Sequence, residues 1–366
     1  MGELRKEINS LLQSEVEKKA RFVKQTYYES GPRALKLLAR RMRKQQTDNL
    51  ISKVRDPKTN QIKCEPTDIR NIFKKYYEEL YKQTSGMNRT KTQEFLNTLD
   101  MPSIGEVQNK SLTAEITTEE LQQVMGKLKS GKSPGCDGFP SEWYRTYYKE
   151  LMPLLRDTFN WVIKEGKTPP SWKEAIISVI PKGKKDREHC QNYRPISLLN
   201  TDYKMFSSIL ASRIQLFLSD LIDEDQTGFV KGRQTFDNIR RTLHVIDRAH
   251  RNKLPVGLIS LDAEKAFDRV NWEFLYLALE KFGFNDKSVQ CIKSLYQNPT
   301  ARVRVNGSLS ERFLLERGTR QGCCLSPSLF AIYIEPLAQL IRQHLLIPGV
   351  EINGTEHKIC LFADDV

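Results

Sequence analysis

Three short apolar segments lie between stretches of helical periodicity, and they limit what this chain can fold into. Residues 175–180, 256–261 and 359–363 are rich in β-branched and other apolar side chains, and they have the length of strands. Apolar side chains recur at helical spacing between them, as over residues 205–222 and 236–250. Strands separated by helices indicate an α+β or α/β core.

Two of these segments end in acidic residues. Asp262 follows residues 256–261, and Asp364 and Asp365 follow residues 359–363. Mg²⁺ is usually bound through one or two carboxylates plus substrate phosphates, and two metal ions can clamp the oxygens of a phosphoryl transfer. The alternative is that each aspartate caps a helix or a turn. Consecutive strand residues point to opposite faces, so Asp364 and Asp365 share a site only if the chain turns there.

Charge favours a polyanionic partner. The 366 residues carry a net charge of +13, which is typical of nucleic-acid-binding proteins, although a solvated lysine-rich surface is the alternative. The seven cysteines include no Cys-x-x-Cys pair, and an irregular set of this kind fits reduced thiols inside the cell. No apolar run approaches the roughly 20 residues that span a bilayer.

Local patterns divide the chain. Residues 1–110 are highly charged and mostly helical in period, and residues 36–44 form a basic segment that is either an arm along RNA or a set of solvated helices. Thr117 and Glu120 predict a capping box, with Gly131 ending the helix. Further patterns predict a hairpin about Asn306 and Gly307 and helices at residues 272–282, at residues 287–296 and from Ser326-Pro327 onward.

Seven ordered strings identify a family resemblance over residues 111–366. LDAEKAFDRV, RQGCCLSP and LFADD resemble polymerase motifs A, B and C of reverse transcriptases. GKSPGCDGFPSEWY, IPKGKKD, NYRPISLLN and DQTGFVKGRQTFDNI resemble the finger motifs of the long-interspersed-element (non-long-terminal-repeat) branch. The resemblance implies an α+β right-hand polymerase of fingers and palm at residues 111–366, preceded by a basic, mainly helical extension at residues 1–110. The chain ends one residue after Asp365, so we expect a truncated fragment without a thumb that is inactive by itself.

The resemblance also assigns roles to single residues. Asp262 and Asp364 match the metal ligands, with Asp365 as the neighbouring acid and the Ala263 carbonyl as a further ligand. Phe267 matches the steric gate that excludes a 2′-hydroxyl. The remaining matches are Lys182 and Arg194, which hold the triphosphate, and Gln321 and Gly322, which line the nascent base pair. The alternatives are a solvated Lys182, an Arg194 paired to an acid, and a Phe267 that only packs the core.

The activity implied is RNA-directed DNA polymerisation, in which deoxynucleotides are added to a primer 3′-hydroxyl on an RNA template. It requires two Mg²⁺ ions, with Mn²⁺ as the alternative ion. The expected partners are an RNA template, a DNA primer and deoxynucleoside triphosphates, without a membrane; the oligomeric state is not indicated. The expected location is a cytoplasmic ribonucleoprotein and the nucleus. The alternatives are a nucleic-acid-binding protein without catalysis and a maturase-like splicing factor on the same fold.

Overall fold

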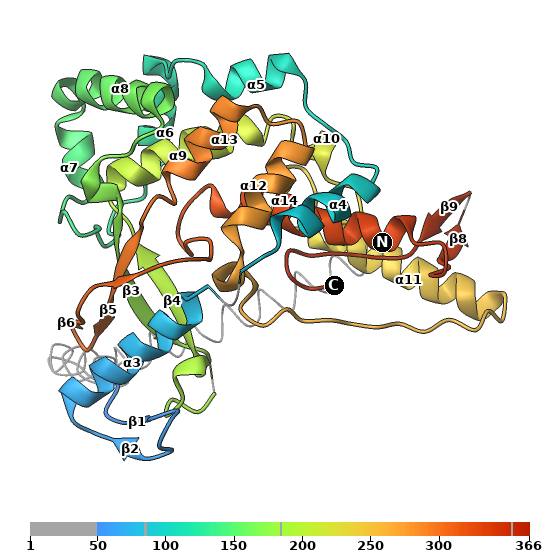
Figure 1. Cartoon of the computed structure of the whole chain (residues 1–366), viewed down its shortest axis with the longest axis horizontal. Coiled ribbons are helices and arrows are strands. Elements are labelled where there is room, and N and C mark those ends of the chain that lie inside the picture. The colour runs from blue at the N-terminus through green and yellow to red at the C-terminus, as the bar shows by residue number, and fades with distance from the viewer. Residues whose placement is uncertain (1–49, 84–85, 184, 353) are drawn as a thin grey trace, which may run out of the picture. The chain divides into compact units, whose positions relative to one another are not determined.

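The computed structural model describes residues 50–83, 86–183, 185–352 and 354–366. The chain divides into two compact units, Met1–Ser52 and Lys53–Val366, and the second carries all the elements in Figure 1. The basic segment at residues 36–44 lies outside the described residues. The boundary expected at residue 110 does not coincide with this division, because helices between residues 66 and 113 pack on later elements of the second unit.

One mixed sheet organises the described part of the chain. Its central strand β3 (Glu174–Pro181) pairs antiparallel with β4 (Tyr193–Leu198) and parallel with β5 (Thr300–Val305). The short strands β6 (Ser308–Leu309) and β7 (Phe313–Leu314) pair antiparallel with β5. The segment at residues 175–180 is therefore a strand, as predicted. Side chains of β5 alternate between half-buried and buried, because one face of the sheet packs on the core.

The hairpin about Asn306 and Gly307 is confirmed. Both residues have positive φ, +49° and +85°, as the two central positions of a type I′ turn require. The turn brings β6 back along β5, where Val305 pairs with Ser308. Beyond β6 the chain pairs with β5 again at Phe313–Leu314 of β7.

Helices are the longest of the other described elements, which confirms a mixed helix-and-sheet class. The helices before β4 are α3 (Pro66–Tyr81), α4 (Arg89–Thr98), α5 (Glu106–Thr113), α6 (Thr118–Lys127), α7 (Ser141–Thr146), α8 (Tyr148–Glu165), η2 (Pro170–Trp172) and η3 (Cys190–Asn192). Those after it are α9 (Thr201–Ile214), α10 (Leu218–Leu221), α11 (Thr235–Arg251), η4 (Ala266–Arg269), α12 (Trp272–Lys281), α13 (Asp286–Ser294) and α14 (Ser326–Gln343). Small hairpins are formed by β1 (Val54–Arg55) with β2 (Ile62–Lys63) and by β8 (Val350–Ile352) with β9 (Thr355–His357). None of the described helices is both long and apolar enough to cross a bilayer.

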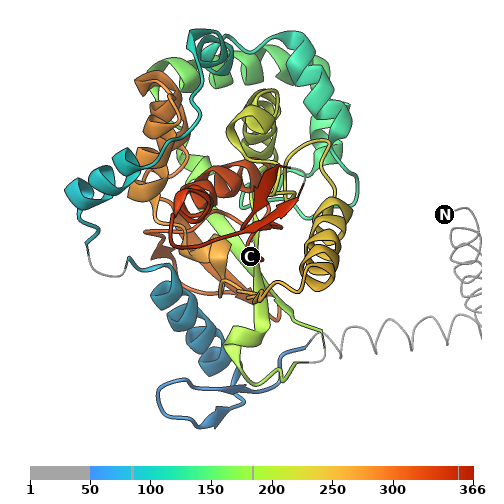
Figure 2. The same ribbon diagram turned by 90° about the vertical axis from the view of Figure 1, so that its right-hand side faces the viewer.

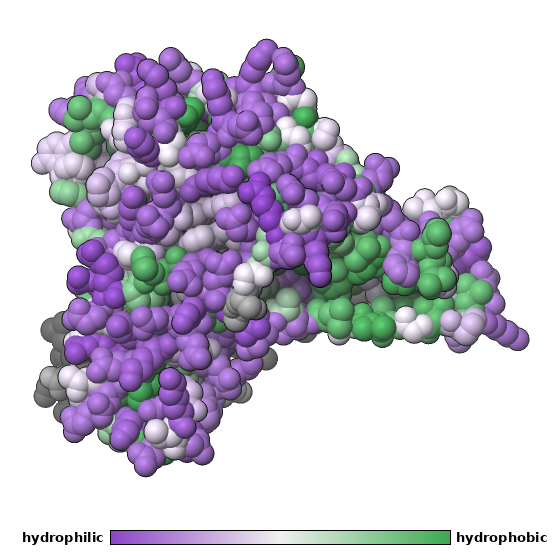
Figure 3. All heavy atoms as spheres, viewed as in Figure 1, coloured by the Kyte–Doolittle hydropathy of each residue, from purple (hydrophilic) through white to green (hydrophobic). Residues whose placement is uncertain are grey.

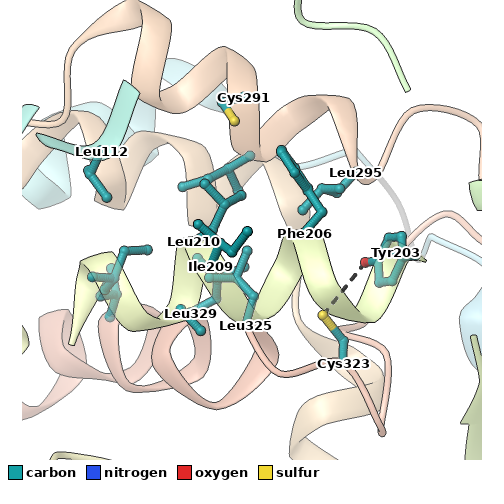
Figure 4. Close-up of a cluster of buried hydrophobic side chains, with 14 of the residues drawn as sticks. Leu112, Tyr203, Phe206, Ile209, Leu210, Cys291, Leu295, Cys323, Leu325 and Leu329 are labelled. Carbon is teal, nitrogen blue, oxygen red and sulfur yellow. Dashed lines mark hydrogen bonds between the residues drawn. The ribbon is translucent and has the colours of Figure 1, made fainter. Parts of the chain in front are cut away.

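Helix α9 runs through the centre of the largest hydrophobic cluster. It buries apolar side chains on several faces, as a helix surrounded by other elements does. Figure 4 shows Phe206, Ile209 and Leu210 of this helix among side chains from α13 and from the start of α14. The single helix predicted over residues 205–222 is wrong, because α9 ends at Ile214 and α10 begins only at Leu218. At the break, Nε2 of the Gln215 side chain donates to the Phe229 carbonyl at 2.8 Å.

The predicted capping box is confirmed. The Glu120 amide donates to Thr117 Oγ1 at 3.3 Å, and the Thr117 amide donates to Glu120 Oε2 at 3.2 Å. The helix ends at Lys127, before Gly131. Glu120 also receives the buried guanidinium of Arg213, with an N–O distance of 2.7 Å. This pair ties α6 to the central helix α9.

The segment at residues 256–261 differs from its prediction as a buried strand. Leu258 and Ile259 are 72% and 79% exposed, and only the last residue pairs, since Leu261 and Val366 exchange backbone hydrogen bonds of 2.7 and 3.0 Å. The apolar stripe of α11 (Phe236, Ile239, Leu243 and Ile246) is also exposed. A groove of about 440 Å³ lies between α11 and the end of this segment. Figure 3 shows hydrophobic surface near this part of the molecule. The sequence shows that the side chains of residues 256–261 and of the α11 stripe are apolar. It does not show whether another part of the protein covers them.

Replacing Arg213 should destabilise the fold. Its guanidinium donates to the Glu120 carboxylate and to the carbonyls of Leu112, Ala114 and Glu115. We expect Arg213→Met to lower the free energy of unfolding by about 3 kcal/mol, because a carboxylate and several carbonyls lose their donor. Denaturant unfolding measures this change. Arg251→Met, which removes an exposed pair with Asp247, is the control and should cost less than about 0.5 kcal/mol. Equal losses in the two variants would contradict the assignment.

Candidate active site

Most of the predicted site residues line a single cleft of about 820 Å³. The predicted residues that line it are Lys182, Arg194, Asp262, Ala263, Phe267, Gln321 and Asp364. They come from the end of β3, from β4, from the segment around η4, from the loop before α14 and from the last turn of the chain. Asp365 and Gly322 do not line it. The fold thus gathers residues that are up to 182 positions apart in sequence, from Lys182 to Asp364.

A tight turn separates the two neighbouring acids. Phe362 and Asp365 exchange backbone hydrogen bonds of 2.9 and 3.2 Å, and Ala363 has φ of +59°. Asp365 pairs antiparallel with Asp262. The chain therefore turns at these residues, but Asp364 and Asp365 do not line the same cavity. Asp364 faces the large cleft with Asp262, whereas Asp365 lines the groove beside α11.

The side chain of Gln226 stabilises this turn by hydrogen bonds to its backbone. Its side chain is fully buried, its Oε1 accepts from the Ala363 amide at 3.0 Å, and its Nε2 donates to the Ala363 carbonyl at 3.2 Å. The backbone of Thr227 donates to the Leu361 carbonyl at 2.9 Å. At Gly228 a Cβ atom would lie 2.2 Å from the Ala363 nitrogen, so only glycine permits this approach.

Electrostatics in the cleft fit a divalent cation. Burial raises the pKa of Asp364, and the neighbouring carboxylates of Asp365 and Asp262 raise it further. A metal ion shared by Asp262 and Asp364 would offset this repulsion. Within the described residues, no group of three or more His, Cys, Asp or Glu side chains is arranged to hold a metal. Asp262 and Asp364 supply carboxylate oxygens on one cleft, and Mg²⁺ is usually bound by one or two carboxylates together with substrate phosphates.

Lys182 and Arg194, the side chains predicted to hold the triphosphate, lie at the end of the β3–β4 ladder. Arg194 pairs with Ile180 across the strands, and the Lys182 amide donates to the Asn192 carbonyl at 2.8 Å. Arg194 is exposed, and no ion pair to an acid is found for it in the part of the chain that the structure describes. Lys182 is half-buried. Both lie on the cleft that holds the carboxylates.

Phe267 is held by two other aromatic rings. It stacks on Phe330 with centroids 4.3 Å apart and meets Phe229 edge-on at 5.7 Å. Its side chain is partly buried against the main core and also lines the cleft. Packing and gating are therefore both compatible with its position. Phe229 belongs to the string DQTGFVKG, but no role was predicted for this residue from the sequence.

A buried carboxylate links Gln321 to helix α3. Asp268 is 1% exposed, and its two oxygens accept from the Tyr81 hydroxyl at 2.7 Å and from Gln321 Nε2 at 3.0 Å. The Ser197 amide donates to the Gln321 carbonyl at 2.8 Å. At Gly322, with φ of +119°, a Cβ atom would lie 2.7 Å from the Ser197 carbonyl. Gly322 thus permits close backbone packing and does not itself line the cleft.

Gln226 and Tyr81 were also not predicted to belong to this site. Gln226 belongs to a recognised string in which no role was predicted for its side chain, and its full burial follows only from the folded structure. Figure 2 shows the ribbon of the fold from a second direction. Tyr81 lies within residues 1–110, which were predicted to form an extension before the polymerase fold. Neither position carries a local signal, because each acts on a residue at least 137 positions away.

Comparisons with known proteins agree with the motif order. Residues 180–366 match the family described as reverse transcriptase (RNA-dependent DNA polymerase). The chain is 33% identical over 304 residues to the Transposon TX1 uncharacterized 149 kDa protein of Xenopus laevis, covering 82% of this chain and 23% of that protein. It is 26% identical over 298 residues to the probable RNA-directed DNA polymerase from transposon BS of Drosophila melanogaster, covering 81% and 32%.

A third relative is similar over a shorter region. The chain is 29% identical over 253 residues to the RNA-directed DNA polymerase from mobile element jockey of Drosophila melanogaster, which covers 68% of this chain and 27% of that protein. The chain thus spans about a quarter to a third of the length of these curated relatives.

The buried Asp268 should make stability depend on pH. Burial raises the pKa of its carboxyl from 3.8 to about 6, against the opposing effects of the Tyr81 and Gln321 hydrogen bonds and of Lys265 and Lys182. The folded state therefore binds this proton more tightly, and the stability it contributes is complete below pH 3.8 and is lost as pH rises through about 6. Between about pH 4 and about pH 7, the wild type should lose about 2–3 kcal/mol more than Asp268→Asn. Parallel stability curves from denaturant unfolding would contradict this.

Proposed function

Because the chain belongs to the reverse transcriptase (RNA-dependent DNA polymerase) family, we propose that it carries the polymerase core of a non-long-terminal-repeat retrotransposon. The core adds deoxynucleotides to a primer 3′-hydroxyl on an RNA template. The observation that carries the proposal is the single cleft that holds Asp262 and Asp364 together with Lys182 and Arg194. Carboxylates for metal and cations for phosphate are the groups that phosphoryl transfer needs. The transposon names of the relatives support the assignment to a mobile element.

We propose that the compact unit comprises fingers and palm. The β3–β4 ladder with Lys182 and Arg194 corresponds to the fingers, and the segments that carry Asp262 and Asp364 correspond to the palm. The unit begins before residue 110, since α3 contributes Tyr81 to the site. The proposed location is a cytoplasmic ribonucleoprotein and the nucleus.

The family's divalent metal is proposed to be a pair of Mg²⁺ ions, or Mn²⁺ in their place. Such ions lower the cost of the charge that develops on the transferred phosphoryl group. Asp262 and Asp364 would hold them, with the Ala263 carbonyl as a further oxygen ligand. Asp365 faces the neighbouring groove, so we assign it a weaker contribution through its charge. Gln226 keeps Asp364 in place by holding the Ala363 peptide.

Substrate binding follows from the other residues of the cleft. Lys182 and Arg194 bind the triphosphate of a deoxynucleotide, which neutralises its charge and orients it for attack by the primer 3′-hydroxyl. Phe267 stands at the position of the sugar gate. Gln321 lies beside the nascent base pair, while Gly322 lets its loop pack on β4. These groups position reactants, and positioning is most of what a polymerase contributes to phosphoryl transfer.

A nucleic-acid-binding protein without catalysis is the second candidate. The net charge of +13 favours it as much as it favours a polymerase. The two candidates differ in one respect, because only a polymerase needs the carboxylates of the cleft. Binding of an RNA–DNA duplex alone therefore does not separate them, whereas dependence on Asp262 and Asp364 does.

Neutralising either carboxylate should separate catalysis from binding. We expect Asp262→Asn and Asp364→Asn each to reduce extension of a DNA primer on an RNA template, with Mg²⁺ and deoxynucleotides, by at least roughly 1,000-fold, because each removes metal-held transition-state stabilisation. The affinity for the RNA–DNA duplex should change less than about twofold, since the carboxylates do not bind the backbone. Primer extension and fluorescence anisotropy measure the two quantities.

Controls define what each result means. Asp247→Asn removes an exposed carboxylate on α11 and should leave both quantities unchanged. Extension that survives in both cleft variants would refute the assignment of Asp262 and Asp364. Metal-dependent nucleotide binding without extension would support the cleft as a nucleotide site but would not support the polymerase reaction. Duplex binding with neither nucleotide binding nor extension would favour the second candidate.

Removing the Phe267 ring should relax the choice of sugar. Phe267→Ala opens space for a 2′-hydroxyl and leaves the carboxylates in place, so the ratio of ribonucleotide to deoxynucleotide incorporation should rise by roughly 10–200-fold. The ratio is measured by primer extension on protein shown by circular dichroism to be folded. If Phe267 only packs against Phe330 and Phe229, both activities should fall together at a constant ratio, which would remove the gate assignment.

A further inference from the structure

The turn that carries Phe267, the proposed sugar gate, contacts helix α3 at two points. Lys265, with φ of +54°, places its ammonium over the Tyr76 ring at 4.5 Å and beside the Tyr76 hydroxyl. Three residues later, Asp268 accepts from the Tyr81 hydroxyl at 2.7 Å. Phe267 stands between these two anchors. Helix α3 therefore supports the segment that follows Asp262, although it lies outside residues 180–366, which match the family.

The carboxylate of Asp268 also determines how the Gln321 amide is oriented. An ionised carboxylate only accepts hydrogen bonds, so the Gln321 group that faces Asp268 has to be its NH₂, as the 3.0 Å contact from Nε2 shows. The Tyr81 hydroxyl occupies the other carboxylate oxygen as a donor. Gln321 lines the cleft, and its Oε1 is the amide atom that Asp268 leaves free for a ligand.

We propose that Tyr81 and Asp268 are positioning residues that turn the Gln321 amide oxygen toward the bound nucleotide. The cleft then offers an acceptor at this point, and it selects a ligand that presents a hydroxyl or amino donor there. This inference rests on the proposed function. It adds a determinant of nucleotide binding from helix α3, and it gives the buried Asp268 a role beyond packing.

Backbone contacts support a role in positioning the loop as well. The Thr319 amide donates to the Phe267 carbonyl at 2.7 Å, and the Gly318 amide donates to the Val270 carbonyl at 2.7 Å. The loop that carries Gln321 therefore lies directly on the turn that carries Asp268.

The orientation of the Gln321 amide can be read without catalysis. In protein labelled with ¹⁵N-glutamine, the Gln321 side-chain signal is identified by its loss in Gln321→Glu. Its NH₂ protons should exchange with water about 10-fold faster in Asp268→Asn and in Tyr81→Phe than in the wild type, because the hydrogen bond to a fixed carboxylate is weakened. Tyr333→Phe is the matched control, since its hydroxyl accepts from the Asn271 amide at 3.4 Å away from the cleft. It should leave the exchange rate unchanged.

Nucleotide affinity tests the polarity of the site. The dissociation constant of the complementary deoxynucleotide is measured with an RNA template, a dideoxy-terminated primer and Ca²⁺. Asp268→Asn should weaken binding about 10-fold, because the introduced amide can donate and lets the Gln321 NH₂ turn to the cleft. Gln321→Glu should weaken it more, since two carboxylates then face each other. The double variant Asp268→Asn/Gln321→Glu should bind at least about fivefold more tightly than Gln321→Glu alone, because the introduced asparagine donates to the introduced carboxylate and an acceptor again faces the cleft.

The outcomes separate this inference from the proposed function. If the wild-type protein binds no nucleotide, the proposed function is refuted for this chain. The exchange rates of the Gln321 NH₂ protons would still decide whether Asp268 and Tyr81 hold Gln321. Unchanged exchange in folded Asp268→Asn and Tyr81→Phe would overturn the positioning role. Additive losses in the double variant, with normal wild-type binding, would show that Asp268 acts only through the general stability of the fold and would overturn the inference.

Discussion

The hydrogen bonds between Gln226 and the Ala363 peptide are the contact on which the rest of the site depends. Ala363 adopts a left-handed conformation, with φ of +59°, which a residue other than glycine enters only at a cost of about 1–2 kcal/mol. The buried Gln226 amide satisfies both the donor and the acceptor of that residue. This arrangement determines that Asp364 faces the cleft with Asp262 while Asp365 faces the neighbouring groove. Without it, a two-residue turn would give the Asp364 carboxylate, which is proposed to bind metal, no fixed direction.

Close backbone packing connects this turn to the side of the cleft that carries Arg194. Asp262 pairs with Asp365, the chain from Asp262 leads to the turn at Phe267 and Asp268, and that turn lies against the loop of Gln321. The loop in turn packs on Ser197 of β4, the strand that carries Arg194. Carboxylates and cations are therefore joined through backbone contacts rather than through mobile surface side chains. Placement of this kind suits a reaction in which the protein mainly orients charged groups.

The sequence predicted the elements with strong local signals. The capping box at Thr117, the turn at Asn306 and Gly307, and the strand at residues 175–180 each depend on residues close together in the chain. The motif strings also predicted seven residues that line one cleft. Local patterns failed where distant contacts decide the outcome. Residues 256–261 have the composition of a buried strand but are exposed, and Tyr81 and Gln226 act on residues that no periodicity links to them. The metal-binding and nucleotide-binding roles remain proposals that geometry supports.

The most direct measurement is anomalous diffraction from crystals of the protein with an RNA–DNA duplex, a deoxynucleotide and Mn²⁺. The account predicts anomalous density in the large cleft, in contact with carboxylate oxygens of both Asp262 and Asp364, with the nucleotide triphosphate between the metal and the side chains of Lys182 and Arg194. Mn²⁺ reports on a Mg²⁺ site, because both ions prefer oxygen ligands. Density bound to only one of these aspartates, or found only outside the cleft at saturating Mn²⁺, would contradict the claim that the fold assembles a polymerase metal site from these two residues.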